Sequence, residues 1–264
     1  MIIFDNHVHL KNESVEYFYR EFGMNGGTGL NIVNLTENCF TLDSFAQKYR
    51  ETQAIAEKLK EKGLDVVVTI GPYPVNIIEM IKYMSIGEAI ALYEKAVDIS
   101  VQEIMEQRAD AIGEVGRPHF QVDERIIEAS NEIMSYIFSV SKDNDIPVIL
   151  HTESLDSHGM CGIMELASKV GKKDRIIKHF SQPIFSDNCG IIPSVPANRK
   201  NARNAPWGNE GFFLETDFAG DISKPNFVLP ADSVPNRIKM LLQEGVEEDR
   251  IIRSMEFYRK FYRK

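Results

Sequence analysis

The sequence has few cysteines, and their spacing does not indicate a disulfide scaffold or a cysteine metal site. Cys39, Cys161 and Cys189 are scattered, odd in number and without a Cys-x-x-Cys pair. We therefore expect no disulfide framework and a reducing compartment.

Long hydrophobic runs are also missing. No apolar run approaches the ~18 residues of a membrane span. The first five residues reach an acid, Asp5, without the basic region that opens a signal peptide. We expect a soluble cytoplasmic chain with no membrane association.

Basic residues are fewer than acidic residues. The chain has 30 Lys+Arg against 39 Asp+Glu, a net charge of −9, which argues against broad non-specific binding to nucleic acid or anionic membranes. The 43% hydrophobic content excludes a disordered chain. No repeat, low-complexity tract or linker divides the 264 residues, so we expect a single domain over residues 1–264.

Short β-branched runs alternate with stretches of helical period. The predicted strands are 2–4, 30–35, 64–70, 111–115, 146–150, 175–178, 190–195 and 211–215. Most are continuously apolar, as expected of parallel strands covered on both faces. The clearest helices are 43–61, 86–108, 123–142 and 161–170, the first with Asp43 or Ser44 as N-cap and Gly63 after its end. We expect 71–108 to hold two helices and 196–209 to be a loop.

Eight strands alternating with helices predict a (β/α)8 TIM barrel, which typically takes about 250 residues. The alternative is an open doubly wound sheet, but no Gly-x-Gly-x-x-Gly follows the first strand. The aromatic and basic segment 250–264 is interpreted as a closing amphipathic helix, with a nucleic-acid-binding tail as the alternative.

Histidines and acids follow several predicted strands. His7 and His9 lie two residues apart and so point to the same side of a strand end, where two imidazoles can chelate a metal. Glu114 interrupts an apolar run, and a buried carboxylate needs a strong partner. In a barrel such strand ends converge on the C-terminal face. The sequence therefore predicts one metal site built from His7, His9, Glu114, His151, His179 and Asp217.

This constellation resembles the amidohydrolase superfamily of metal-dependent barrels, and the Glu on the fourth strand is similar to its TatD-related branch. The resemblance implies that His7, His9 and Asp217 bind one metal, that His151 and His179 bind a second, and that Glu114 bridges them. It also implies hydrolysis, most often of phosphodiesters in nucleic acid, with Asp217 taking the proton of a metal-activated water.

The residues around the ligands depart from the common TatD pattern. Arg117-Pro118-His119 stands where the family often has Leu-Asp, and Glu153 where an Arg is usual. Phe180-Ser181-Gln182-Pro183 replaces the usual Cys-Phe-Ser-Gly. The resemblance therefore implies more about the reaction mechanism than about the substrate.

Imidazoles and carboxylates without thiolates favour a catalytic centre with two divalent ions, zinc first and manganese or magnesium as alternatives. The expected partner is a phosphate-ester substrate, including single-stranded nucleic acid, with no obligate protein partner. The alternatives are a small amide, lactone or deaminase substrate at the same site, and a barrel that binds metal without turnover.

Weaker substrate candidates come from the loops. Arg117 and His119 follow the fourth strand, and Arg199 and Arg203 follow the seventh. The guanidinium groups suit phosphate, and the alternative for all four residues is a solvated loop. Trp207 either stacks on a base or anchors its loop to the barrel rim. Asp156 and His158 are expected in a surface loop, and the role of Asp221 is left open.

Overall fold

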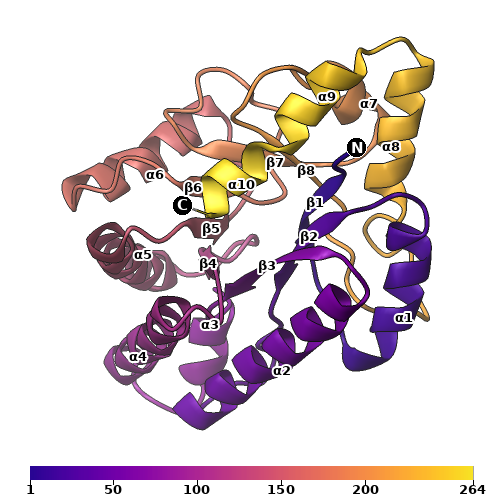
Figure 1. Ribbon diagram of the computed structural model, residues 1–264. Coiled ribbons are helices and arrows are strands. Elements are labelled where there is room, and N and C mark those ends of the chain that lie inside the picture. The colour runs from indigo at the N-terminus through magenta and orange to yellow at the C-terminus, as the bar shows by residue number, and fades with distance from the viewer. Residues whose placement is uncertain (264) are drawn as a thin grey trace.

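Eight parallel strands form a (β/α)8 barrel with helices around it in the computed structural model, which describes residues 1–263 (Figure 1). The strands are β1 (Phe4–Val8), β2 (Gly29–Val33), β3 (Asp65–Ile70), β4 (Ala111–Gly116), β5 (Val148–His151), β6 (Ile176–Lys178), β7 (Ile192–Pro196) and β8 (Phe213–Glu215). The helices are α1 (Val15–Phe18), α2 (Leu42–Glu61), α3 (Asn76–Met80), α4 (Ile86–Met105), α5 (Glu124–Asn144), α6 (Ser157–Lys169), α7 (Arg199–Asn204), α8 (Ser233–Gln243), α9 (Glu248–Met255) and α10 (Phe257–Tyr262), with short helical turns at Asn12–Ser14 and Tyr19–Gly23.

The strand order follows the chain, which confirms the predicted barrel and excludes the open sheet. Closure comes from a parallel bridge between Val8 and Phe218 and from the Asp217 N–H, which donates to the His7 carbonyl over 2.9 Å. The first and last strand ends are thereby neighbours. Residues that are more than 200 positions apart in the sequence share one site for this reason.

The predicted elements agree with the structure except at some boundaries. The α2 N-cap is Thr41 rather than Asp43 or Ser44, because the Thr41 side chain accepts from the Ser44 N–H while Ser44 returns a bond. Gly63 adopts the left-handed φ of 85° after the helix end, as predicted. Residues 196–209 are not wholly a loop, because Asn198 caps the short helix α7 by accepting from the Asn201 N–H.

The C-terminal segment closes the barrel end opposite the C-terminal strand ends. It forms two short helices, α9 and α10, rather than one (Figure 1). The aromatic side chains of α10 are buried. Tyr258 stacks on Phe4 with ring centroids 4.0 Å apart, and the Tyr262 hydroxyl donates to Asn6 Oδ1 inside the barrel. This supports the closing-helix interpretation over the tail; Lys264 lies outside the described residues.

A disulfide corrects the expectation drawn from the cysteines. Cys161 of α6 is bonded to Cys189, which lies in the helix-free connection between β6 and β7, with their Cα atoms 5.1 Å apart. Their sequence separation of 28 hides the pairing, which the adjacency of β5, β6 and β7 creates. The cysteine argument for a reducing compartment therefore no longer holds. Across residues 1–263, no helix is long and apolar enough to cross a membrane.

Removing this disulfide is expected to destabilise the fold. Replacing both Cys161 and Cys189 by Ser should lower the free energy of unfolding by about 3.5 kcal/mol, because the cross-link constrains a loop of this length in the unfolded chain. Urea unfolding measures the loss. Dithiothreitol should shift the wild-type midpoint and leave the double variant unchanged; an unshifted wild type would contradict the bond.

Candidate metal centre

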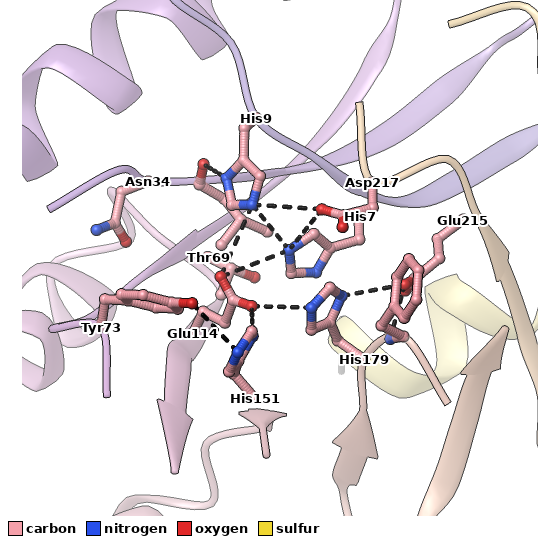
Figure 2. Close-up of polar contacts among 12 residues, drawn as sticks. His7, His9, Asn34, Thr69, Tyr73, Glu114, His151, His179, Glu215 and Asp217 are labelled. Carbon is pink, nitrogen blue, oxygen red and sulfur yellow. Dashed lines mark hydrogen bonds and ion pairs between the residues drawn. The ribbon is translucent and has the colours of Figure 1, made fainter. Parts of the chain in front are cut away.

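The structure brings the six predicted ligands together at the C-terminal end of the barrel (Figure 2). They come from five strands or the residues that directly follow them: His7, His9, Glu114, His151, His179 and Asp217. Their side chains are largely buried, and Glu114 lies among all four imidazoles. The strand-end argument thus gives the correct juxtaposition, while the metal-binding roles stay a prediction.

One half of the cluster joins His7 of β1, and His9 just after that strand, to two carboxylates. His7 Nε2 lies 3.2 Å from His9 Nε2. Glu114 Oε2 lies 3.8 Å from His7 Nε2 and 3.7 Å from His9 Nε2, and Asp217 Oδ1 lies 4.0 and 3.6 Å from the same two nitrogens. Tetrahedral ligands about 2.0–2.1 Å from zinc lie roughly 3.3 Å apart, so this half is close to the spacing that the ion requires.

The other half uses the second oxygen of the same carboxylate. Glu114 Oε1 lies 2.9 Å from His179 Nε2 and in hydrogen-bond contact with His151 Nδ1. These three side chains, like the set of His7, His9 and Glu114, place their ligand atoms within 4.8 Å of one another. Glu114 therefore faces one imidazole pair with each oxygen, as a bridging ligand must.

Glycines beside Glu114 allow β4 to lie this close to β5. A Cβ on Gly116 would stand 2.4 Å from the His151 carbonyl oxygen, and its φ of 134° also disfavours a side chain. A Cβ on Gly113 would stand 2.8 Å from the Ile149 carbonyl oxygen. The Gly-Glu-Val-Gly sequence thus brings Glu114 and His151 within contact.

Asp217 holds an unusual backbone conformation at the end of β8. Its φ of 49° lies in the left-handed region, which is costly for a residue with a side chain. Its N–H is fixed by the His7 carbonyl. The strain is localised where the chain must turn the carboxylate toward His7 and His9.

Burial and close charges set the protonation of the cluster. Burial lowers the pKa of His7 well below its usual value and also lowers that of His151. Burial opposes the charge on Glu114 and His179 as well, but the imidazoles hold the pKa of Glu114 well below its usual range, and the flanking Glu114 and Glu215 raise the pKa of His179 to about 10. Burial raises the pKa of Asp217 to about 6.

Two contacts to the ligand rings were not found by sequence reasoning. Glu215 accepts from His179 Nδ1 over 3.0 Å and is itself held by the Phe180 N–H and the Ser194 hydroxyl. Tyr73 Oη lies 3.2 Å from His151 Nε2. The sequence could have indicated Glu215, because it lies two residues before Asp217 at the same strand end. Tyr73 follows an apolar strand, but no motif around it indicates a role at the site.

The predicted substrate arginines do not lie beside the cluster. Arg117 donates to Asn131 and Glu153, and Arg203 donates to Glu244 beyond the end of α8. Arg199 is exposed on α7, and none of the three lines the cavity above the metal centre. Side-chain direction, which loop sequence does not encode, separates these residues from the site.

His119 does line the cavity, with Nδ1 2.8 Å from His151 Nε2. Trp207 is buried and donates its Nε1–H to the Ala202 carbonyl, in agreement with the anchoring interpretation. Asp156 caps α6, His158 is exposed on that helix, and Asp221 accepts from the Ser223 N–H in a surface turn.

Metal binding is expected to release protons. Because the pKa of His179 is raised to about 10, its ring is protonated at pH 7 in the metal-free protein, and Nε2 must lose that proton to ligate. Zinc uptake at pH 7 should release at least one proton per chain, and affinity should fall as pH falls. Calorimetry in buffers of different protonation enthalpy measures the release; buffer-independent heats would contradict it.

Glu215→Gln is expected to weaken metal binding by Glu114, His151 and His179 by about 10–100-fold. The neutral amide does not supply the negative charge that orients the His179 ring and makes it a stronger ligand. Competition with a chromogenic chelator measures the affinity. Glu210→Gln, an exposed acid paired with Lys260, is the matched control and should bind as wild type. Equal affinities for Glu215→Gln and wild type would show that Glu215 does not support the ligand.

Comparisons with known proteins agree with the barrel fold and identify a family. Residues 4–255 match the family described as TatD related DNase. An uncharacterised protein of Methanocaldococcus jannaschii is 28% identical over 93% of this chain and 89% of its own length. A TatD homologue from Escherichia coli is similar in fold, with a TM-score of 0.67 and 15% identity over 98% of this chain and 97% of the other. A phosphotriesterase homology protein from Escherichia coli, with phosphate in its active site, has a TM-score of 0.61 and 14% identity over 99% and 98% of the two chains.

Proposed function

This chain belongs to the family of TatD-related DNases, and from that premise we propose that it is a binuclear metal-dependent hydrolase that activates water for attack on an ester bond. The position of Glu114 carries the proposal. Its two oxygens face two separate imidazole pairs, and such a carboxylate can hold two divalent ions at a short, fixed separation.

The ligand assignment follows from these contacts. His7, His9 and Asp217 would hold one ion, His151 and His179 the other, and Glu114 both, with zinc as the first choice and manganese or magnesium as substitutes. The donor chemistry fits, since each imidazole turns a ring nitrogen toward a carboxylate oxygen. Divalent ions held there would lower the pKa of a water molecule, to about 7 for zinc, and would stabilise the negative charge that develops on the ester.

The protein's own residues position the reaction and move its proton. Asp217 accepts a proton from the attacking water at a carboxylate oxygen, the water oxygen bonds to the ester centre, and the ester C–O or P–O bond breaks. The proton then passes to the departing alkoxide. Glu215 and His119 hold the His179 and His151 rings in place from the side away from Glu114.

The family description makes a phosphodiester, including single-stranded nucleic acid, the first substrate class to test. The second class is a small uncharged ester or lactone. It is favoured because Arg117, Arg199 and Arg203 do not line the cavity.

The test is metal-dependent turnover. Protein stripped of metal and reloaded with zinc, manganese or magnesium is assayed on single-stranded DNA and RNA, bis(4-nitrophenyl) phosphate, and uncharged 4-nitrophenyl esters. We expect hydrolysis of at least one class that needs added metal and a metal content near two ions per chain. Bound metal without turnover of any ester would favour the amide and deaminase alternatives or the non-catalytic barrel.

A further inference from the structure

The cavity above the metal centre has an apolar wall. It measures about 680 Å³, which lies within the range of small-molecule sites. Polar residues, including five of the predicted ligands, line it as well. The apolar part is built by Leu35, Phe180, Pro183, Pro196, Ala219, Phe227 and Val228.

Two aromatic rings of this wall are exposed at the surface. Phe227, in the connection between β8 and α8, is 74% exposed, and Phe180, directly after His179, is 46% exposed. Exposed large apolar groups beside a cavity gain free energy when an apolar ligand covers them. Both rings belong to cavity-lining residues, and Phe180 is fixed through its N–H to Glu215.

Charged groups suited to phosphate are scarce in the same wall. Apart from five of the six predicted ligands and His119, the ionisable carboxylate and ammonium groups among the described lining residues are Glu37 and Lys178. Lys178 is 2% exposed and donates to the His179 carbonyl. Glu37 is exposed, and its carboxylate repels an anion.

Nucleic-acid binding needs the opposite composition. Lysines and arginines contact successive phosphates, and aromatic rings stack on bases within a basic groove. Two arginines that the sequence suggested as phosphate contacts donate to other residues of the protein instead. Arg117 donates to Asn131 and Glu153, and Arg203 donates to Glu244. A strand of nucleic acid would meet an apolar wall and an acidic residue at this cavity.

We propose that the substrate is a small uncharged ester with an apolar chain, which packs against Phe180 and Phe227 while its ester group meets the metal centre. This inference rests on the proposed function and narrows its substrate. The step balances as simple hydrolysis: a water oxygen bonds to the acyl carbon or phosphorus, the ester bond breaks, and the alkoxide takes the proton held by Asp217.

The first experiment varies chain length and charge on the metal-loaded protein. For 4-nitrophenyl carboxylates from two to eight carbons, kcat/KM should rise about three- to fourfold per methylene that reaches the wall. A dialkyl 4-nitrophenyl phosphate separates the acyl from the phosphotriester form. Bis(4-nitrophenyl) phosphate and single-stranded DNA should be at least about tenfold poorer, since the wall offers their charge no partner. A flat chain-length series with a preferred phosphodiester would overturn the inference and leave the proposed hydrolase standing.

The variant Phe227→Ser tests the wall itself. It should flatten the chain-length series, because kcat/KM falls most for the longest esters. Tyr83→Ser is the matched control, because Tyr83 is 75% exposed and does not line the cavity. An unchanged series in Phe227→Ser would count against the inference.

A binding measurement tests the apolar wall without requiring hydrolysis. Calorimetry of metal-free protein with linear alkan-2-ones should give affinity that rises with chain length in wild type and Tyr83→Ser but not in Phe227→Ser. That pattern without hydrolysis of any ester would support the apolar wall as a ligand site but reject both the ester substrate and the proposed function. Length-independent binding in all three proteins would overturn the inference.

Discussion

Glu114→Gln is expected to empty both metal sites and to reduce hydrolysis to background. The carboxylate offers one oxygen to the pair His7 and His9 and the other to the pair His151 and His179. The amide keeps one oxygen and presents an NH2 group, which does not ligate, to the other pair. It also removes the negative charge on which both ions depend.

The expected loss of metal affinity exceeds about 100-fold, since an outer partner of a ligand alone contributes 10–100-fold. Metal content after dialysis and turnover of an ester substrate measure the effect. Glu153→Gln, which changes an acid bonded to Arg117 outside the ligand set, should keep two ions. Two ions retained by Glu114→Gln would show that the carboxylate does not bridge them.

The barrel and the ligand cluster could be read from the sequence because both depend on short-range patterns. Continuous apolar runs mark buried parallel strands, and in parallel strands the carboxyl ends meet on one face. A His or acid just after such a run therefore has its position in three dimensions fixed by its position in the sequence. His151 at the end of β5 and His179 after β6 illustrate this, since no local motif joins them.

The paths of the loops and the directions of their side chains cannot be predicted in the same way. Arg203 follows the seventh strand and is therefore a candidate substrate contact, but residues 199–204 form a helix and the guanidinium donates to Glu244. The Cys161–Cys189 disulfide joins an expected helix to a loop whose path no periodicity encodes. Both outcomes depend on which way a loop leaves the barrel, and that is decided by packing between distant segments.

Asp217→Asn is expected to lower kcat by about 10²–10⁴-fold while most of the metal remains. The amide oxygen can still take the ligand position 3.6 Å from His9 Nε2, and the backbone N–H still bonds to the His7 carbonyl. What the variant loses is the ability to accept a proton from the attacking water. The loss should therefore fall on kcat far more than on KM or metal content.

Comparison with Asp221→Asn separates chemistry from local structure. Asp221 lies four residues further on, caps a surface turn and does not line the cavity, so its variant should turn over as wild type. Higher pH supplies hydroxide directly and should recover part of the rate in Asp217→Asn, since no proton then has to be removed from the nucleophile. If Asp217→Asn holds both ions and stays within tenfold of the wild-type kcat, another group accepts the proton. Among the described cavity-lining residues, His119 beside His151 is then the next base to replace.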